Sequence, residues 1–254
     1  MNDKLHFKMI TYSRIFTRCD QPADVINYIQ DIAKLKRDDL DIEEINILFR
    51  AIHELIKKTR KSWEIICSIE SNEIKKKSKF RKVVKDAKEE VFKEMEEYAI
   101  VGHGLIDRYL MRNVKSPSLE ALYLMQKGDL DRLMISFTFK DEDNKQVIDL
   151  QDKAGICYEK AFEICKILDD LSSIKAGIIL HYAVFLYEEK KDVSKAYKIA
   201  NDFYQNSDGL LKNVKNRSTF SDLIRILSII KQNIDVWSIK INSNVENDES
   251  KDKK

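Results

Sequence analysis

The chain has 254 residues, 43% of them hydrophobic, which is enough to bury a sizeable core. It contains only two prolines and six glycines, so the composition disfavours a turn-rich β fold and favours long helices. The formal net charge is +2 although 35% of the residues are charged, so opposite charges are interspersed. No global field favours a nucleic-acid partner, and any site that recognises a charged ligand must be local.

Apolar residues recur at helical spacing along most of the chain and predict an all-α protein of about nine helices, most of them antiparallel to their neighbours in sequence. A short N-terminal pair should cover about 3–18 and 22–37, and a long helix should start near Asp41. The sequence DIEE at 41–44 resembles a capping box, in which Asp41 accepts from orphan N–H groups and Glu44 reaches back.

A second long helix should run from about residue 79 to residue 113. Ser116 should cap the next helix, with Pro117 in its first position, and Asp192 should cap a later one. The polar stretch 140–146 is expected to be a surface loop. The remaining helices are expected at about 147–169, 173–190, 193–206 and 220–239.

We expect residues 1–239 to form a single helical domain. The segment 240–254 is polar and lacks apolar periodicity, so it should be a disordered tail. No fixed-period repeat is strong enough to predict a solenoid.

The sequence contains no pattern typical of a catalytic, metal or phosphate-loop site. Its four histidines are scattered, its four cysteines form no CxxC pair, and there is no GxSxG elbow. The first residues, MNDKLHFKM, contain no apolar segment typical of a signal peptide, and no apolar run approaches the ~20 residues that span a bilayer. We therefore expect a cytoplasmic protein with no catalytic residues, no metal, no cofactor and no membrane partner.

Five ordered segments carry a resemblance to a known family. They are INILFRAIHELIKKTRKSWEIICSIES (45–71), LYLMQKGDLDRL (122–133), CYEKAFEICK (157–166), AGIILHYAVFLYEE (176–189) and FSDLIRILSIIKQNIDVW (220–237). Together they resemble the 14-3-3 family over about residues 3–239. The resemblance implies nine antiparallel helices that form a concave groove, a cup-shaped dimer and no catalytic activity, with phosphoserine or phosphothreonine peptides as ligands.

The family holds the phosphate with one lysine, two arginines and a tyrosine. By resemblance, Arg60 and Arg132 occupy the two arginine positions, where planar guanidinium groups suit a phosphate dianion. His53 occupies the lysine position and Leu133 the tyrosine position, so the pocket should be degraded. Lys57 lies one turn past His53 and could reach the phosphate. On pattern alone, this basic stripe would indicate a solvated helix face.

The resemblance also assigns a peptide-binding groove. Asn233 matches an asparagine that holds the peptide backbone, and His181 replaces its partner asparagine, so the peptide preference should have changed. The apolar wall of the groove is expected to consist of Leu180, Val184, Ile226, Ile229 and Trp237.

The family dimerises through a turn that resembles residues 16–25. Arg18 should pair with Glu94 of a second subunit. Phe16 stands for a small alanine and Ala87 for a tyrosine, a swap that exchanges volume across one interface. We therefore expect a homodimer that pairs poorly with ordinary family members.

The leading hypothesis is an adaptor or scaffold that binds phosphoserine or phosphothreonine peptides and regulates its partner proteins, with a degraded phosphate pocket and altered specificity. The alternative is a scaffold of the same fold that binds unmodified or acidic peptides independently of phosphorylation. A helical-repeat scaffold unrelated to phosphate comes next, and an enzyme comes last.

Overall fold

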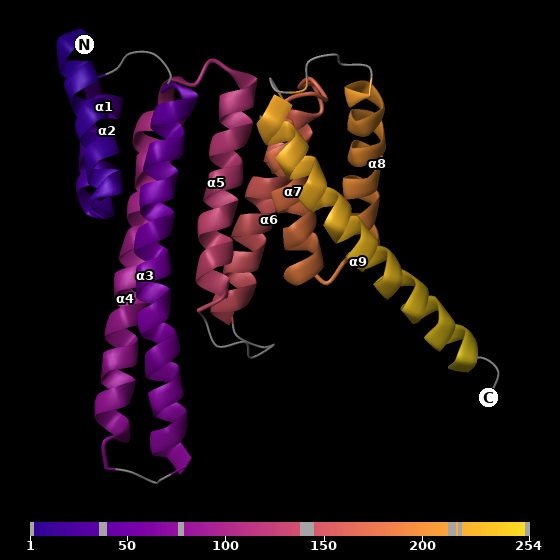
Figure 1. Ribbon diagram of the computed structural model, residues 1–254. Helices are drawn as coiled ribbons and strands as arrows, with labels where there is room; N and C mark the ends of the chain where they lie inside the picture. The colour runs from indigo at the N-terminus through magenta and orange to yellow at the C-terminus, as the bar shows by residue number, and fades with distance from the viewer. Residues whose placement is uncertain are drawn as a thin grey trace. The chain divides into compact units, whose positions relative to one another are not determined.

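The computed structural model describes residues 3–35, 40–75, 79–137, 145–212, 217 and 220–251. Within this part the regular structure is entirely helical, in nine α-helices and two short helical segments of other kinds (Figure 1). The all-α prediction is therefore confirmed. No helix in these ranges is both long enough and apolar enough to cross a membrane.

The chain divides into two compact units, which are described separately. Unit 1 comprises Met1–Lys115 and Leu130–Leu150, and unit 2 comprises Ser116–Asp129 and Gln151–Lys254. The expectation of a single domain over 1–239 stays a prediction.

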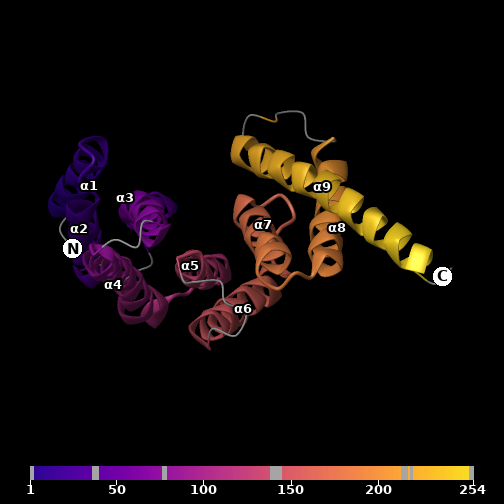
Figure 2. The same ribbon diagram turned by 90° about the horizontal axis from the view of Figure 1, so that it is seen from below.

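Unit 1 contains four long helices: α1 (Asp3–Arg18), α2 (Pro22–Leu35), α3 (Ile42–Lys75) and α4 (Arg81–Leu105). The pairs α1–α2, α2–α3 and α3–α4 pack against each other, and α3 lies beside α4 in both views (Figures 1 and 2). Their apolar stripes meet in a core that includes Val25, Ile29, Ile32, Ile45, Leu48, Ile52, Ile56 and Met95.

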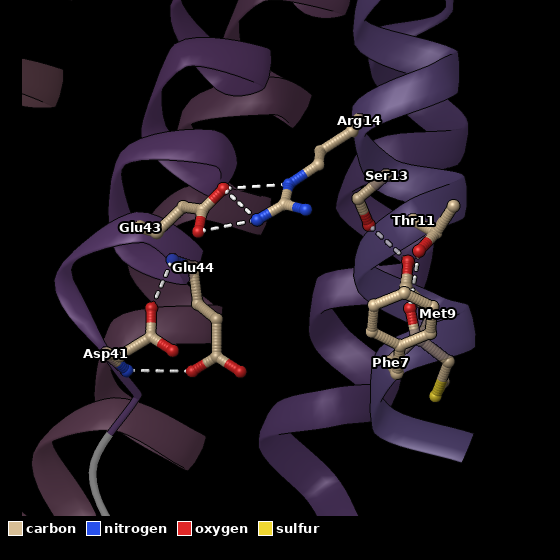
Figure 3. Close-up of polar contacts among 8 residues, drawn as sticks. All are labelled: Phe7, Met9, Thr11, Ser13, Arg14, Asp41, Glu43 and Glu44. Atoms are coloured by element: carbon tan, nitrogen blue, oxygen red, sulfur yellow. Dashed lines mark hydrogen bonds and ion pairs between the residues drawn. The ribbon is translucent and has the colours of Figure 1, made fainter. Parts of the chain in front are cut away.

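The capping box at the start of α3 is confirmed (Figure 3). Asp41 Oδ1 accepts from the Glu44 backbone N–H at 2.9 Å, and Glu44 Oε2 accepts from the Asp41 N–H at 2.7 Å. Two orphan donors are thereby satisfied. Beside the box, the Arg14 guanidinium donates to both Glu43 carboxylate oxygens at 2.8 and 2.7 Å, which joins α1 to the first turn of α3.

The second long helix differs from the expected single α-helix over 79–113. After Leu105 the chain continues as a π-helical turn, Ile106–Leu110, and then as a 3-10 turn, Met111–Asn113. Leu105, Ile106 and Leu110 are buried along this stretch.

The helix α5 (Pro117–Ile135) and the helix α6 (Lys145–Cys165) each contribute to both units. Residues 140–144 of the expected loop lie outside the described residues, and α6 begins within its last two positions. The end of α6 comes four residues earlier than expected, because the backbone N–H groups of Lys166, Ile167 and Leu168 donate to carbonyls three residues back instead of four.

Unit 2 is completed by α7 (Ser173–Glu188), α8 (Val193–Leu211) and α9 (Ser221–Lys251), which pack against one another (Figures 1 and 2). Asp192 caps α8 as predicted, since its Oδ1 accepts from the Lys195 N–H at 3.0 Å. A glycine at position 128 is required on α5, because a Cβ there would lie 3.0 Å from the Tyr158 ring.

The structure describes residues 240–251 as a continuation of α9, and the expectation of a disordered tail from residue 240 stays a prediction. This segment contains no glycine or proline, so nothing in it stops an established helix from propagating. Residues 252–254 lie outside the described part.

Candidate functional site

Arg60 lies on the exposed face of α3 and is held at two points. Its Nε is 3.0 Å from Glu64 Oε1, one turn further along the same helix. Its guanidinium carbon is 5.8 Å from the centre of the Phe137 ring. A half-exposed cation on an aromatic face keeps its charge available while its position is restricted.

His53 and Lys57 precede Arg60 on α3. His53 is half-buried, and its Nε2 atom is buried. Lys57 is exposed and lies 3.5 Å from Glu54 on the same helix. The pattern-only interpretation of a solvated face therefore describes Lys57, whereas the imidazole of His53 is turned toward the protein.

Arg132 and Leu133 lie in the part of α5 that belongs to unit 1, and both are half-buried. Phe137, whose ring lies under Arg60, follows Arg132 by five residues. The contact brings the middle of α3 to the chain segment that ends α5. The convergence of Arg60 and Arg132 on one anion stays a prediction.

Asp131 is a neighbour of Arg132 that the sequence analysis missed. Its Oδ1 is 2.9 Å from His103 Nε2, and its side chain is 8% exposed. The pair ties α4 to α5 within unit 1 and restrains the backbone that carries Arg132. Gly102, one residue before His103, allows this approach, since a Cβ there would meet a Leu130 methyl group at 2.7 Å.

His181 is fixed by two side chains of unit 2 that the sequence analysis also missed. Asp129 Oδ1 accepts from the Tyr158 hydroxyl at 2.5 Å and lies 2.8 Å from His181 Nδ1. The Asp129 side chain is 4% exposed and that of His181 is 33% exposed. Because the carboxylate oxygen accepts, we assign a proton to Nδ1, so Nε2 is the ring nitrogen left for a ligand.

The expected apolar wall is only partly exposed. Leu180, Val184 and Ile226 are half-buried and pack against the core of unit 2, Ile229 is exposed, and Asn233 on α9 is half-buried. Trp237, the remaining residue expected in the wall, is buried.

Trp237 is 3% exposed and stacks on Tyr187 with ring centres 5.3 Å apart. Lys240 covers the Tyr187 ring, with its Nζ 4.8 Å from the ring centre. Trp237 therefore supports α9 from the core, and its place in the groove wall, which the family resemblance implied, stays a prediction.

The residues expected at the dimer interface have contacts within the chain. The Phe16 ring stacks on Tyr28 with centres 5.5 Å apart and planes 15° apart. Glu94 accepts from the Tyr98 hydroxyl at 2.7 Å, and burial together with this hydrogen bond raises the pKa of Tyr98 to about 12. Arg18 is exposed and Ala87 is half-buried.

The helices and side chains in the described ranges define an all-α protein without a cluster of three or more His, Cys, Asp or Glu side chains placed to hold a metal ion there. Residues 12–238 match the family model of the 14-3-3 protein. The chain belongs to the 14-3-3 family.

Three relatives illustrate the distance within this family. The chain is 27% identical to 14-3-3 protein 3 of Entamoeba histolytica over 228 residues, which cover 89% of this chain and 92% of the relative. It is 24% identical to 14-3-3 protein 2 of the same organism, covering 91% and 94%. It is 28% identical to 14-3-3 protein theta of Homo sapiens over 201 residues, covering 79% and 80%. Family membership supports the general role of a phosphopeptide-binding adaptor.

Proposed function

We propose that this chain is an adaptor without catalytic activity that binds phosphoserine or phosphothreonine peptides and regulates the proteins that carry them. Arg60 and Arg132 bind the phosphate, with His53 and Lys57 as further donors. The observation that carries this proposal is the Arg60 guanidinium, half-exposed and seated 5.8 Å from Phe137 on the segment that follows Arg132. The family implies a cytoplasmic location, which we adopt.

The phosphate pocket is weaker than that of ordinary relatives in this proposal. A hydrogen bond to a charged group contributes roughly 1.5–3 kcal/mol. His53 in place of a lysine and Leu133 in place of a tyrosine therefore weaken binding by about one to three decades. Glu64 adds to this, because it competes with the phosphate for Arg60.

Unit 2 supplies the proposed contacts to the peptide backbone and the proposed apolar contacts. His181 and Asn233 hydrogen-bond to the peptide backbone, and Leu180, Val184, Ile226 and Ile229 provide apolar contacts. His181 replaces an asparagine, whose amide group has both a donor and an acceptor. Because Asp129 holds Nδ1 of His181, the ring offers the peptide only Nε2. For that reason, the preferred peptide sequence differs from that of ordinary relatives in this proposal.

The test compares one phosphoserine peptide with its unmodified form by isothermal titration. Arg60→Ala and Arg132→Ala should each weaken binding of the phosphorylated form at least about thirtyfold, since each removes a charged partner of the phosphate. Lys58→Ala is the matched control, because Lys58 lies on the same helix but is paired with Asp20 at 2.8 Å. The affinity of the Lys58→Ala variant for the phosphorylated peptide should stay within about twofold of wild type.

The second candidate function is a scaffold of the same fold that binds unmodified or acidic peptides. The pairing of Arg60 with Glu64 favours it, since a partly neutralised arginine is a weaker phosphate ligand. Equal affinities for the phosphorylated and unmodified peptides would establish this candidate and remove the first.

We also propose a homodimer that uses Phe16, Arg18, Ala87 and Glu94. The Phe16 ring, stacked on Tyr28, would fill the space left by Ala87 in the second copy. Native mass spectrometry should give a homodimer, and efficient heterodimers with an ordinary family member would contradict the exchange of volume.

A further inference from the structure

Unit 1 contains an apolar cavity that the proposed phosphate site does not use. It has a volume of about 440 Å³ and is lined by side chains that include Trp63, Phe92 and Phe137. The Trp63 ring centre lies 5.9 Å from that of Phe92 and 6.5 Å from that of Phe137, the second pair nearly perpendicular at 82°. Three aromatic rings from α3, α4 and the segment after α5 therefore share one hollow.

The charges around this cavity balance. Lys88 is 4% exposed, its Nζ lies 2.5 Å from Glu70 Oε2, and it also lies 5.1 Å from the centre of the Trp63 ring. The lining as a whole includes three lysines and three glutamates. A charged ligand would lose its hydration without a net countercharge, whereas a neutral ring would gain contacts with three aromatic side chains.

The cavity shares one side chain with the phosphate site. Phe137 is 2% exposed, lines the cavity and lies 5.8 Å from the Arg60 guanidinium carbon. A ligand that shifts this ring also shifts the surface on which Arg60 rests. Since a cation–π contact depends on the placement of the ring, the two sites are linked through a single residue.

We propose that this cavity binds a neutral planar aromatic molecule of one or two rings, and that its occupancy alters phosphate binding through Phe137. The volume lies within the roughly 300–1,000 Å³ typical of small-molecule sites. The proposal of a binding site rests on the cavity alone, whereas the proposed effect of the ligand on Arg60 also rests on the proposed function.

The test uses 2-naphthol and the two tryptophans of the chain. Trp63 lines the cavity and Trp237 is buried in unit 2, so their indole N–H signals report on different places. The signals are assigned with Trp63→Phe and Trp237→Phe in a ¹⁵N-labelled protein. Titration should shift the Trp63 signal saturably and leave the Trp237 signal unchanged. The absence of a saturable shift, or a response of Trp237 in its place, would overturn the proposal.

Variants of Phe92 locate the binding site. Phe92→Leu keeps an apolar side chain and should weaken 2-naphthol binding about two- to tenfold, because one aromatic contact is lost. Phe92→Ala should weaken 2-naphthol binding further. If the alanine variant does not fold, the leucine variant alone decides the test. Phe80→Ala is the control, since Phe80 is exposed on the same hairpin and outside the cavity. Unchanged affinity in both Phe92 variants would refute the site.

The link to Arg60 has a separate readout. Saturating 2-naphthol should change the affinity for a phosphoserine peptide about two- to fivefold, and Phe137→Leu should abolish this change. An unchanged affinity would refute the link. If no phosphopeptide binds at all, the proposed function fails, and the Trp63 titration still decides the cavity.

Discussion

Unit 1 and unit 2 hold their functional side chains in opposite ways. Arg60 in unit 1 is half-exposed and paired with an exposed Glu64, an arrangement that water and salt weaken. His181 in unit 2 is held by Asp129, which is buried and also accepts from Tyr158. The charged side chain of Arg60 therefore depends on exposed contacts, whereas the ring of His181 is oriented by a buried carboxylate.

The largest contrast between the two units should appear in cysteine reactivity. Cys165 is buried in unit 2, and burial raises the pKa of its thiol to about 11, whereas Cys19 is exposed at the α1–α2 turn. Alkylation by iodoacetamide at pH 8 should be at least about a hundredfold slower at Cys165, since the thiolate is the nucleophile. Peptide mapping by mass spectrometry over time measures both rates, and comparable rates would contradict the packing of unit 2.

The same thiol gives a pH dependence of stability. Below its ordinary pKa of 9.0, Cys165 is neutral in both the folded and the unfolded chain. Between pH 9 and pH 11 the unfolded chain loses this proton and the folded chain keeps it, so the free energy of unfolding falls as pH rises. Cys165→Ala should reduce this fall in urea titrations.

The next contrast concerns the contribution of the Asp129 hydrogen bonds to stability. Asp129→Ala should lower the free energy of unfolding by about 2–3 kcal/mol, because it leaves the buried Tyr158 hydroxyl without its acceptor. Asp235→Ala is the control, since Asp235 is exposed and pairs with Lys231 on the surface of α9, and should cost at most about 1 kcal/mol. Equal losses in urea denaturation would show that unit 2 is no more rigid at this site than at its surface.

The smallest effect should come from freeing Arg60. Glu64→Gln removes the competing carboxylate and should strengthen phosphopeptide binding about two- to fivefold, in line with an exposed ion pair. Asp31→Asn, which removes a similar exposed pair with Lys34 on α2, should leave the affinity unchanged. Isothermal titration at low and high salt measures both. A weaker affinity in Glu64→Gln would mean that Glu64 positions Arg60 and does not compete for it.

Features set by neighbouring residues could be predicted from the sequence. The caps at Asp41 and Asp192 were predicted because each bonds a backbone N–H three residues away. The same holds for the first helices, whose apolar stripes have a clear period. The end of α6 was missed because the apolar period continues through residues 166–168, where the backbone hydrogen bonds change to a tighter turn.

Features set by distant residues could not be predicted in this way. Asp129 and His181 are 52 residues apart, and nothing in the spacing of either indicates the other. Nothing in the local sequence pattern indicates the π-turn after Leu105. Trp237 was assigned to the wall by resemblance to the family, and neither the resemblance nor the sequence pattern gives the depth of its burial.

The central claim is that Arg60 and Arg132 bind the same phosphate group. A double-mutant cycle with Arg60→Ala, Arg132→Ala and the double variant, titrated with a phosphoserine peptide and its unmodified form, tests it most directly. The losses should be confined to the phosphorylated peptide, with a coupling between the two arginines of about 0.5–3 kcal/mol. Additive losses, or equal losses for both peptides, would contradict it.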